Sequence, residues 1–252
     1  MTRLHLVPNA LDFGAPGEPA ALDELLPLGV IRTAAGLTHW VCENAKTTRA
    51  FLKRVDRVVP LARPLQEIAI FELPRPNKGR EAGADAGAFN ALLAPARAGH
   101  ELGLISEAGL PALADPGALL VGAAHAAGIA VVVHAGASSI ALALAASGLN
   151  GQSFAFVGYI PVPAEARAAR IRALEATSRR EGQTQLLIET PYRNAALLEA
   201  LLAHLSPATA LSVSVGLTLP GATTQSATVA QWRQRATTLP PDIPAVFALL
   251  AR

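Results

Sequence analysis

Residues 104–117 read LISEAGLPALADPG and residues 129–139 read IAVVVHAGASS, and these two stretches decide the fold. Each begins with a short apolar run and then breaks into a loop of glycine, proline or serine. A helix-forming run follows each loop, so the pattern is strand, loop, helix, repeated once. Buried parallel strands have continuous apolar runs and are joined by helical crossovers. Because ligands bind beyond the carboxyl ends of such strands, we expect the functional site in these two loops.

The chain has 252 residues, which allows two domains with a core each. We predict an α/β protein with an N-terminal α/β domain over 1–135, a C-terminal α/β domain over 136–252 and a cofactor cleft between them. Because its strands alternate with helices, the first sheet should be mostly parallel, whereas the second should be mixed. Further strands are expected at residues 4–7, 39–44, 68–73, 154–157, 184–189, 211–215, 223–229 and 245–250.

Glycine and proline mark the breaks between these elements. Loops are predicted over 11–19 and 74–87, where both residue types gather. A helix over 20–28 should end at Gly29, and a helix over 88–98 should end or kink at Pro95.

The composition predicts a compact protein without a membrane span. Hydrophobic residues make up 51% of the chain and charged residues 16%. The uncharged run 128–149 is long enough to cross a membrane, but its glycines and serines divide it into strand, turn and helix. Cys42 is the single cysteine, which excludes an intramolecular disulfide and a cysteine-rich metal site. No secretory signal opens the chain, so we expect a cytoplasmic location.

Several enzyme classes lack their motifs here. No two glycines are separated by a single residue, so the dinucleotide fingerprint G-x-G-x-x-G is absent. A phosphate-binding G-K-[ST] loop and the zinc motif H-E-x-x-H are absent as well. Nicotinamide-dependent, nucleotide-hydrolysing and metal-dependent activities are therefore disfavoured.

Three motifs carry a resemblance to a known family. Residues 105–117 resemble SDAGTPxxxDPG, residues 134–149 resemble PGPSAxxxALxxSGL, and residues 158–161 resemble G(F/Y)LP. These are motifs of tetrapyrrole methylase-fold methyltransferases, and the match is to the branch that methylates a ribose of small-subunit ribosomal RNA. The resemblance implies methyl transfer from S-adenosyl-L-methionine, and a homodimer.

The resemblance also implies the residues that contact the cofactor. They are Pro8, Ala108, Gly109, Leu110, Leu113, Gly136, Ser138, Ser139, Glu189, Leu217, Pro244 and Ala245. Two residues in these motifs have equally good structural interpretations. Ser138 is suited to cap the helix that follows it, and Asp115 is as good a turn-former as a functional carboxylate.

Methyl transfer needs few protein groups, because the methyl group is already activated and alignment supplies most of the rate. A hydroxyl acceptor also needs a base. Glu107 is our first candidate, and Glu43 is the second. His134 competes by its pKa, but a histidine at a strand end is usually structural. Arg193 is predicted to contact the substrate.

Three possibilities remain open for the methyl acceptor. It is RNA, it is a tetrapyrrole, or there is none because the protein is a degenerate relative that only binds cofactor. Residues 214–224 lack the charged residues of the ARELTKxxE motif of the ribosomal branch, which argues against small-subunit RNA. Pro244-Ala245 is closer to members acting on cobalamin and sirohaem precursors.

A basic strip of Lys46, Arg49, Lys53 and Arg57 shares one helix face. It is either a phosphate-binding or a solvated face, and we favour the second.

Overall fold

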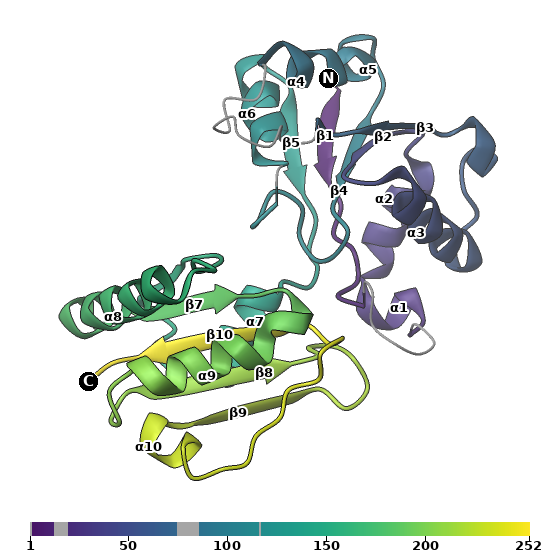
Figure 1. Cartoon of the computed structure of the whole chain (residues 1–252). Helices are drawn as coiled ribbons and strands as arrows, with labels where there is room; N and C mark the ends of the chain where they lie inside the picture. Colours follow the sequence, from purple (N-terminus) through teal and green to yellow (C-terminus); the bar gives the residue numbers. More distant parts are fainter. Residues whose placement is uncertain (1, 13–19, 75–85, 116) are drawn as a thin grey trace. The chain divides into compact units, whose positions relative to one another are not determined.

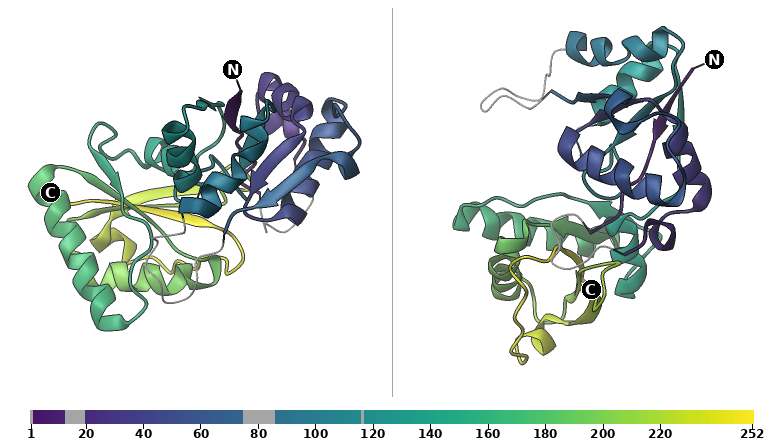
Figure 2. Two further views of the ribbon diagram at one scale, coloured as in Figure 1. Left: turned by 90° about the horizontal axis from the view of Figure 1, so that it is seen from above. Right: turned by 90° about the vertical axis from the view of Figure 1, so that its right-hand side faces the viewer.

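The computed structural model describes residues 2–12, 20–74, 86–115 and 117–252 (Figure 1). These residues form two compact units, the first ending at Ala137 and the second beginning at Ser138. The loops expected over 11–19 and 74–87 lie largely outside the described residues, as does Pro116. Figures 1 and 2 show a sheet with packed helices in each unit. The predicted cleft between the two domains stays a prediction.

The first unit contains a five-stranded, fully parallel sheet in the order β3-β2-β4-β1-β5. Its strands are β1 (Arg3–Leu6), β2 (His39–Cys42), β3 (Ala69–Glu72), β4 (Leu102–Ile105) and β5 (Ala130–Val133). Its helices are α1 (Leu22–Leu25), α2 (Leu28–Gly36), α3 (Ala45–Val58), the 3₁₀ turn η1 (Leu65–Glu67), α4 (Ala86–Leu92), α5 (Ala94–Arg97) and α6 (Ala118–Ala126). The prediction of a mostly parallel first sheet is confirmed.

Alternation along the strands places a core on each face of this sheet. Trp40 packs with α2 and α3 on one face, and its neighbour Val41 packs with α4 and α6 on the other. Gly103 on the adjacent strand makes room for the indole ring, because a β-carbon there would lie 2.6 Å from a ring carbon of Trp40.

The second unit contains a mixed sheet in the order β6-β7-β10-β8-β9, in which β6 and β7 alone are parallel. Its strands are β6 (Phe154–Phe156), β7 (Thr184–Ile188), β8 (Ala210–Val215), β9 (Thr223–Thr228) and β10 (Ala245–Leu250). Its helices are α7 (Ser139–Ser147), α8 (Ala164–Glu181), the 3₁₀ turn η2 (Pro191–Arg193), α9 (Asn194–His204) and α10 (Val229–Trp232). Helices α8 and α9 cover one face and α7 the other (Figure 1), so the predicted mixed sheet is confirmed.

Two predicted helices are wrong in detail. The helix expected over 20–28 ends at Leu25, and Gly29 lies inside α2 instead of closing a helix. The reason is Pro27, because a residue before proline is pushed into the extended region, and Leu26 has φ −124° and ψ 141°. Similarly, the helix expected over 88–98 divides into α4, which ends at Leu92, and the short helix α5, in which Pro95 is the second residue.

The apolar run 128–149 divides as expected into β5, a loop and α7. Within the described ranges, no helix has the length and hydropathy needed to cross a membrane.

Candidate functional site

The loops after β1, β4 and β5 meet at the carboxyl edge of the first sheet, where β2 also ends. Asn9, after β1, and Gly109, after β4, exchange two backbone hydrogen bonds of 2.9 and 3.2 Å. Gly136, after β5, packs on Pro8 so closely that a β-carbon would lie 2.3 Å from the Pro8 β-carbon. Pro8, Gly109 and Gly136 were all predicted cofactor residues, and the fold brings them together.

Asn9 holds this junction, and the sequence reasoning did not single it out. Its side chain is buried, and its amide donates to the backbone oxygens of Ser106 and Glu107 at 3.2 and 3.1 Å. An asparagine directly after an apolar strand and a proline was the available signal, because asparagine side chains bond to loop backbone.

The two predicted catalytic residues lie side by side at this edge. Glu43 follows β2, and its carboxylate accepts the backbone N–H of Glu107 at 3.2 Å. Burial raises the pKa of the Glu43 carboxyl, and the charge of Glu107 adds to this effect. The arrangement places one carboxylate where it orients the loop carrying the other.

Asp115 is the carboxyl group with the most perturbed acidity in this loop. Burial, followed by the charges of Glu43 and Glu107, raises its pKa to about 7 against an opposing hydrogen bond from Ser106. A carboxyl with a pKa near neutrality both gives and takes protons at pH 7. This environment favours the functional interpretation of Asp115 over that of a simple turn-former.

The backbone of the same loop is held in an uncommon conformation. Ala112 and Ala114 have φ of 66° and 69°, which costs an L-residue roughly 1 kcal/mol or more. Between them, Leu113 is 43% exposed, although it is a large apolar residue. Leu113 and the half-buried Leu110 were predicted cofactor contacts, and both lie in this loop.

In the second unit, Ser138 caps α7 as expected, since its hydroxyl accepts the Ala141 N–H at 3.5 Å. Ser139 is the first residue of that helix. The capping duty accounts for Ser138 without a ligand.

Glu189 and Arg193 form an ion pair after β7. The carboxylate and guanidinium lie 2.8 Å apart, and the two side chains are 4% and 24% exposed. The Glu189 carboxylate also accepts the backbone N–H of Thr190 at 2.8 Å. Arg193 therefore compensates the charge of Glu189, and its contact with the substrate stays a prediction.

The loop after β8 meets the segment before β10, which brings the remaining predicted residues together. The Gly216 N–H donates to the Pro244 carbonyl at 2.9 Å. Leu217 packs against the α7 cluster, and Ala245 is buried at the start of β10. Gly216 and the altered motif residues Leu219 and Pro220 line a mostly apolar pocket of about 170 Å³ in this unit.

No set of three or more histidine, cysteine, aspartate or glutamate side chains in the described residues is arranged to hold a metal.

The family model of the tetrapyrrole (corrin/porphyrin) methylases matches residues 24–232. The chain belongs to this family.

The chain is similar to curated ribosomal RNA methyltransferases over part of their length. It is 41% identical over 110 residues to the ribosomal RNA small subunit methyltransferase I of Mesorhizobium japonicum, covering 44% of this chain and 36% of that protein. It is 40% identical over 103 residues to the protein of the same name from Pseudomonas aeruginosa, covering 41% and 34%. The chain thus matches about a third of the length of these relatives.

Solved structures of two methyltransferases share the fold. The uroporphyrin-III-C-methyltransferase of Thermus thermophilus superposes with a TM-score of 0.52 at 20% identity, over 99% of this chain and 92% of that one. The methyltransferase CobJ superposes with a TM-score of 0.57 at 17% identity, over 100% and 95%. These likenesses confirm the predicted two-part α/β architecture.

Proposed function

We propose that the protein is a methyltransferase that uses S-adenosyl-L-methionine. Membership of the tetrapyrrole methylase family over residues 24–232 carries this proposal. It is supported by the junction of Pro8, Gly109 and Gly136 at the carboxyl edge of a parallel sheet, where α/β proteins bind ligands.

The residues at this edge fit that cofactor. Gly109 has φ +70°, and a β-carbon there would lie 3.1 Å from Leu11 and 3.4 Å from the Ala137 oxygen, so the loop needs glycine at this position. Glu43, Glu107 and Asp115 give the edge negative charge, which suits a cation. When bound, the cofactor supplies a methyl group on a positively charged sulfur.

The chain's own residues would then position the reactants and accept a proton. We assign the backbone of Ala108, Gly109 and Leu110 to the methionine part of the cofactor. Glu107, with Glu43 behind it, is proposed to take the proton of an acceptor hydroxyl. Asp115 is suited to the same duty because its pKa is about 7. Contacts between the cofactor and the second unit stay predictions; the residues concerned are Ser138, Ser139, Glu189, Leu217, Pro244 and Ala245.

Although residues 214–224 lack the charged motif of the ribosomal branch, we propose RNA as the acceptor, because the curated relatives at about 40% identity are named for small-subunit ribosomal RNA. The surface of the second unit supports this. Tyr159 and Tyr192, the two tyrosines of the chain, are 59% and 73% exposed and follow the neighbouring parallel strands β6 and β7. Exposed aromatic rings beside an arginine such as Arg193 suit the stacking of unpaired bases.

A tetrapyrrole is the second candidate, favoured by the Pro244-Ala245 motif. The pocket beside this motif, at about 170 Å³, is smaller than the ~300–1,000 Å³ of typical small-molecule sites. The pocket alone therefore does not accommodate a macrocycle.

We further propose that the protein forms a homodimer, which the family resemblance supports. We also propose a cytoplasmic location, which the free, buried Cys42 supports.

Calorimetry tests the cofactor proposal. The wild type should bind S-adenosylmethionine or its demethylated product with micromolar affinity. Leu110→Arg should abolish binding, because it adds a long charged side chain to the proposed site. Leu119→Arg, on an exposed position of α6, is the matched control and should bind normally. Absence of wild-type binding at millimolar ligand would refute the proposal.

Radiolabelled cofactor then tests the acceptor. Label should pass to unmodified small ribosomal subunits, and Tyr192→Ala should reduce the transfer. Phe154→Ala, an exposed aromatic at the opposite end of β6, should leave it unchanged. Transfer to a porphyrinoid instead would favour the second candidate, and transfer to neither would indicate a protein that only binds cofactor.

A further inference from the structure

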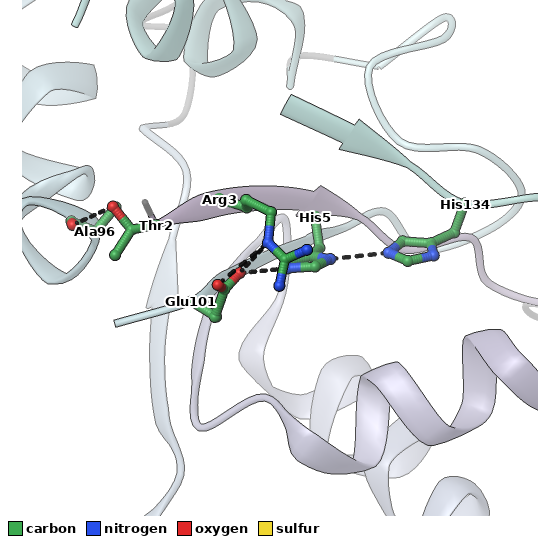
Figure 3. Close-up of polar contacts among 6 residues, drawn as sticks. All are labelled: Thr2, Arg3, His5, Ala96, Glu101 and His134. Atoms are coloured by element: carbon green, nitrogen blue, oxygen red, sulfur yellow. Dashed lines mark hydrogen bonds and ion pairs between the residues drawn. The ribbon is translucent and has the colours of Figure 1, made fainter. Parts of the chain in front are cut away.

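A chain of polar side chains crosses the first sheet outside the proposed site (Figure 3). The Glu101 carboxylate accepts the Arg3 Nε–H at 3.2 Å and lies 2.5 Å from His5 Nε2. On its other side, His5 Nδ1 lies 2.9 Å from His134 Nε2. The two imidazole rings are nearly coplanar and lie edge to edge, with 13° between their planes. His5 is buried, and His134 is half-buried.

Hydrogen-bond chemistry fixes the protons along this chain. An ionised carboxylate only accepts, so His5 Nε2 must carry a hydrogen. A neutral His5 therefore presents a bare Nδ1, and His134 Nε2 must be the donor. His134 in turn presents a bare Nδ1. Each partner sets the tautomer of the next, as in carboxylate–histidine pairs generally.

The hydrogen-bonded side chains of Glu101, His5 and His134 connect opposite ends of the sheet. Glu101 lies just before β4, whereas His134 lies just after β5, at the carboxyl edge. The His134 backbone N–H donates to the Leu6 carbonyl at 3.1 Å. Two residues later, Gly136 packs on Pro8. The position of His134 therefore bears directly on the loop that contacts Pro8.

The surroundings of His134 and Glu101 favour a neutral imidazole and an ionised carboxylate. The groups that face His134 in the described residues are His5 and Arg3 on β1, with Glu101 beyond them. Burial lowers the pKa of His134, as do the charge that His5 carries once it is ionised and the charge of Arg3. Partial burial opposes ionisation of Glu101, but the hydrogen bonds and charges of His5 and Arg3 lower its pKa overall.

We propose that Glu101, His5 and His134 form a proton-sensitive latch that holds the loop 135–137 against Pro8. His134 is then a positioning residue of the proposed cofactor site. One added proton keeps the hydrogen bond, because His134 can take it on the bare Nδ1 while its Nε2–H still donates to His5. When both rings carry an added proton, two N–H donors point at each other across 2.9 Å and the hydrogen bond is lost. Acid strong enough to ionise both rings should therefore release the loop and weaken cofactor binding.

The tautomers are tested first, without any ligand. Long-range proton–nitrogen NMR spectra at pH 7.5 should show hydrogen on Nε2 of both His5 and His134. Hydrogen on Nδ1 of His134 would overturn the proposal. Because this readout needs no cofactor, it remains decisive even if the proposed function fails.

Cofactor affinity against pH tests the consequence, and this part rests on the proposed function. Wild-type affinity should fall by roughly fivefold to tenfold between pH 7.5 and 4.5, where both rings are ionised, through loss of one hydrogen bond, beyond any change also seen in His134→Gln. Gln donates an amide N–H to His5 but does not titrate, so His134→Gln should keep the pH 7.5 affinity. Titration of Asp115 affects both proteins and cancels in the comparison.

His134→Ala should lose affinity at both pH values, whereas the control His125→Ala, exposed on α6, should match the wild type. An His134→Ala protein with wild-type affinity and pH profile would overturn the latch. If the wild type binds no cofactor at either pH, the proposed function fails, and the NMR spectra alone decide the latch.

Discussion

Gly136 and Pro8 are in direct contact, and the contact leaves no room for a side chain at 136. A β-carbon there would lie 2.3 Å from Cβ and 2.4 Å from Cγ of Pro8. The loops after β1 and β5 are therefore packed at backbone distance at the edge where we place the cofactor.

Gly136→Ala should move this loop and weaken cofactor binding by about tenfold or more, since overpacking costs ~1–3 kcal/mol. Calorimetry gives the affinity. Gly122→Ala is the control, because a β-carbon at 122 meets no heavy atom within 4 Å. That change in the middle of α6 should leave binding intact and stabilise the protein by about 0.5–1 kcal/mol. Equal affinities for the two variants would contradict the placement of the site.

Asp115→Asn should stabilise the protein above neutral pH. The folded-state pKa of Asp115, about 7, lies above its usual 3.8, so the folded protein holds this proton more tightly. The stability associated with Asp115 is therefore full below pH 3.8 and is lost as the pH rises through 7. Asparagine mimics the neutral acid and avoids this loss.

Thermal melts should accordingly show a gain for Asp115→Asn over the wild type that is larger at pH 8 than at pH 5. Glu24→Gln, which changes an exposed carboxylate of the same unit, should show no such pH dependence. A gain that is equal at both pH values would mean that Asp115 is ionised throughout.

Arg193→Met should destabilise the protein by about 2–3 kcal/mol, between the costs of breaking an exposed and a fully buried ion pair. The Glu189 carboxylate would stay buried, at 4% exposure, without its cation. A double-mutant cycle with Glu189→Gln in urea unfolding should give a coupling of about 1–2 kcal/mol. A coupling near zero would show that the pair is not formed in solution.

The basic strip of α3 should contribute little to RNA binding. Lys46, Arg49, Lys53 and Arg57 are exposed, while Phe51, Leu52 and Val55 on the other face are buried. If all four cations bound phosphates, the logarithm of affinity would fall with the logarithm of salt with a slope of roughly 3. We expect a shallower slope for a ribosomal RNA hairpin, unchanged in Arg49→Ala/Lys53→Ala. A steep slope that disappears in this variant would establish the strip as an RNA contact.

Local pattern in the sequence determined most of the secondary structure and the order of the motifs. The run Ile129–Val133 predicted a buried strand because β-branched residues suit a pleated sheet. The strand β5 forms there, but at the edge of the sheet, where it is only partly buried. Ser138 predicted a helix start because its hydroxyl satisfies a free backbone N–H. Such signals act over a few residues, and they failed where a neighbour overrides them, as Pro27 does for the helix expected over 20–28.

The tertiary structure alone decided which side chains share an environment. Asp115 has its high pKa because the fold buries it and because the parallel pairing of β2 with β4 brings Glu43 to the same edge. His5 meets His134 because β1 pairs with β5, and no local pattern contains that pairing. Burial and electrostatic coupling act through space between residues far apart in the chain. The sequence therefore indicates the loops of the site, whereas the fold sets the charge states of its carboxyl and imidazole groups.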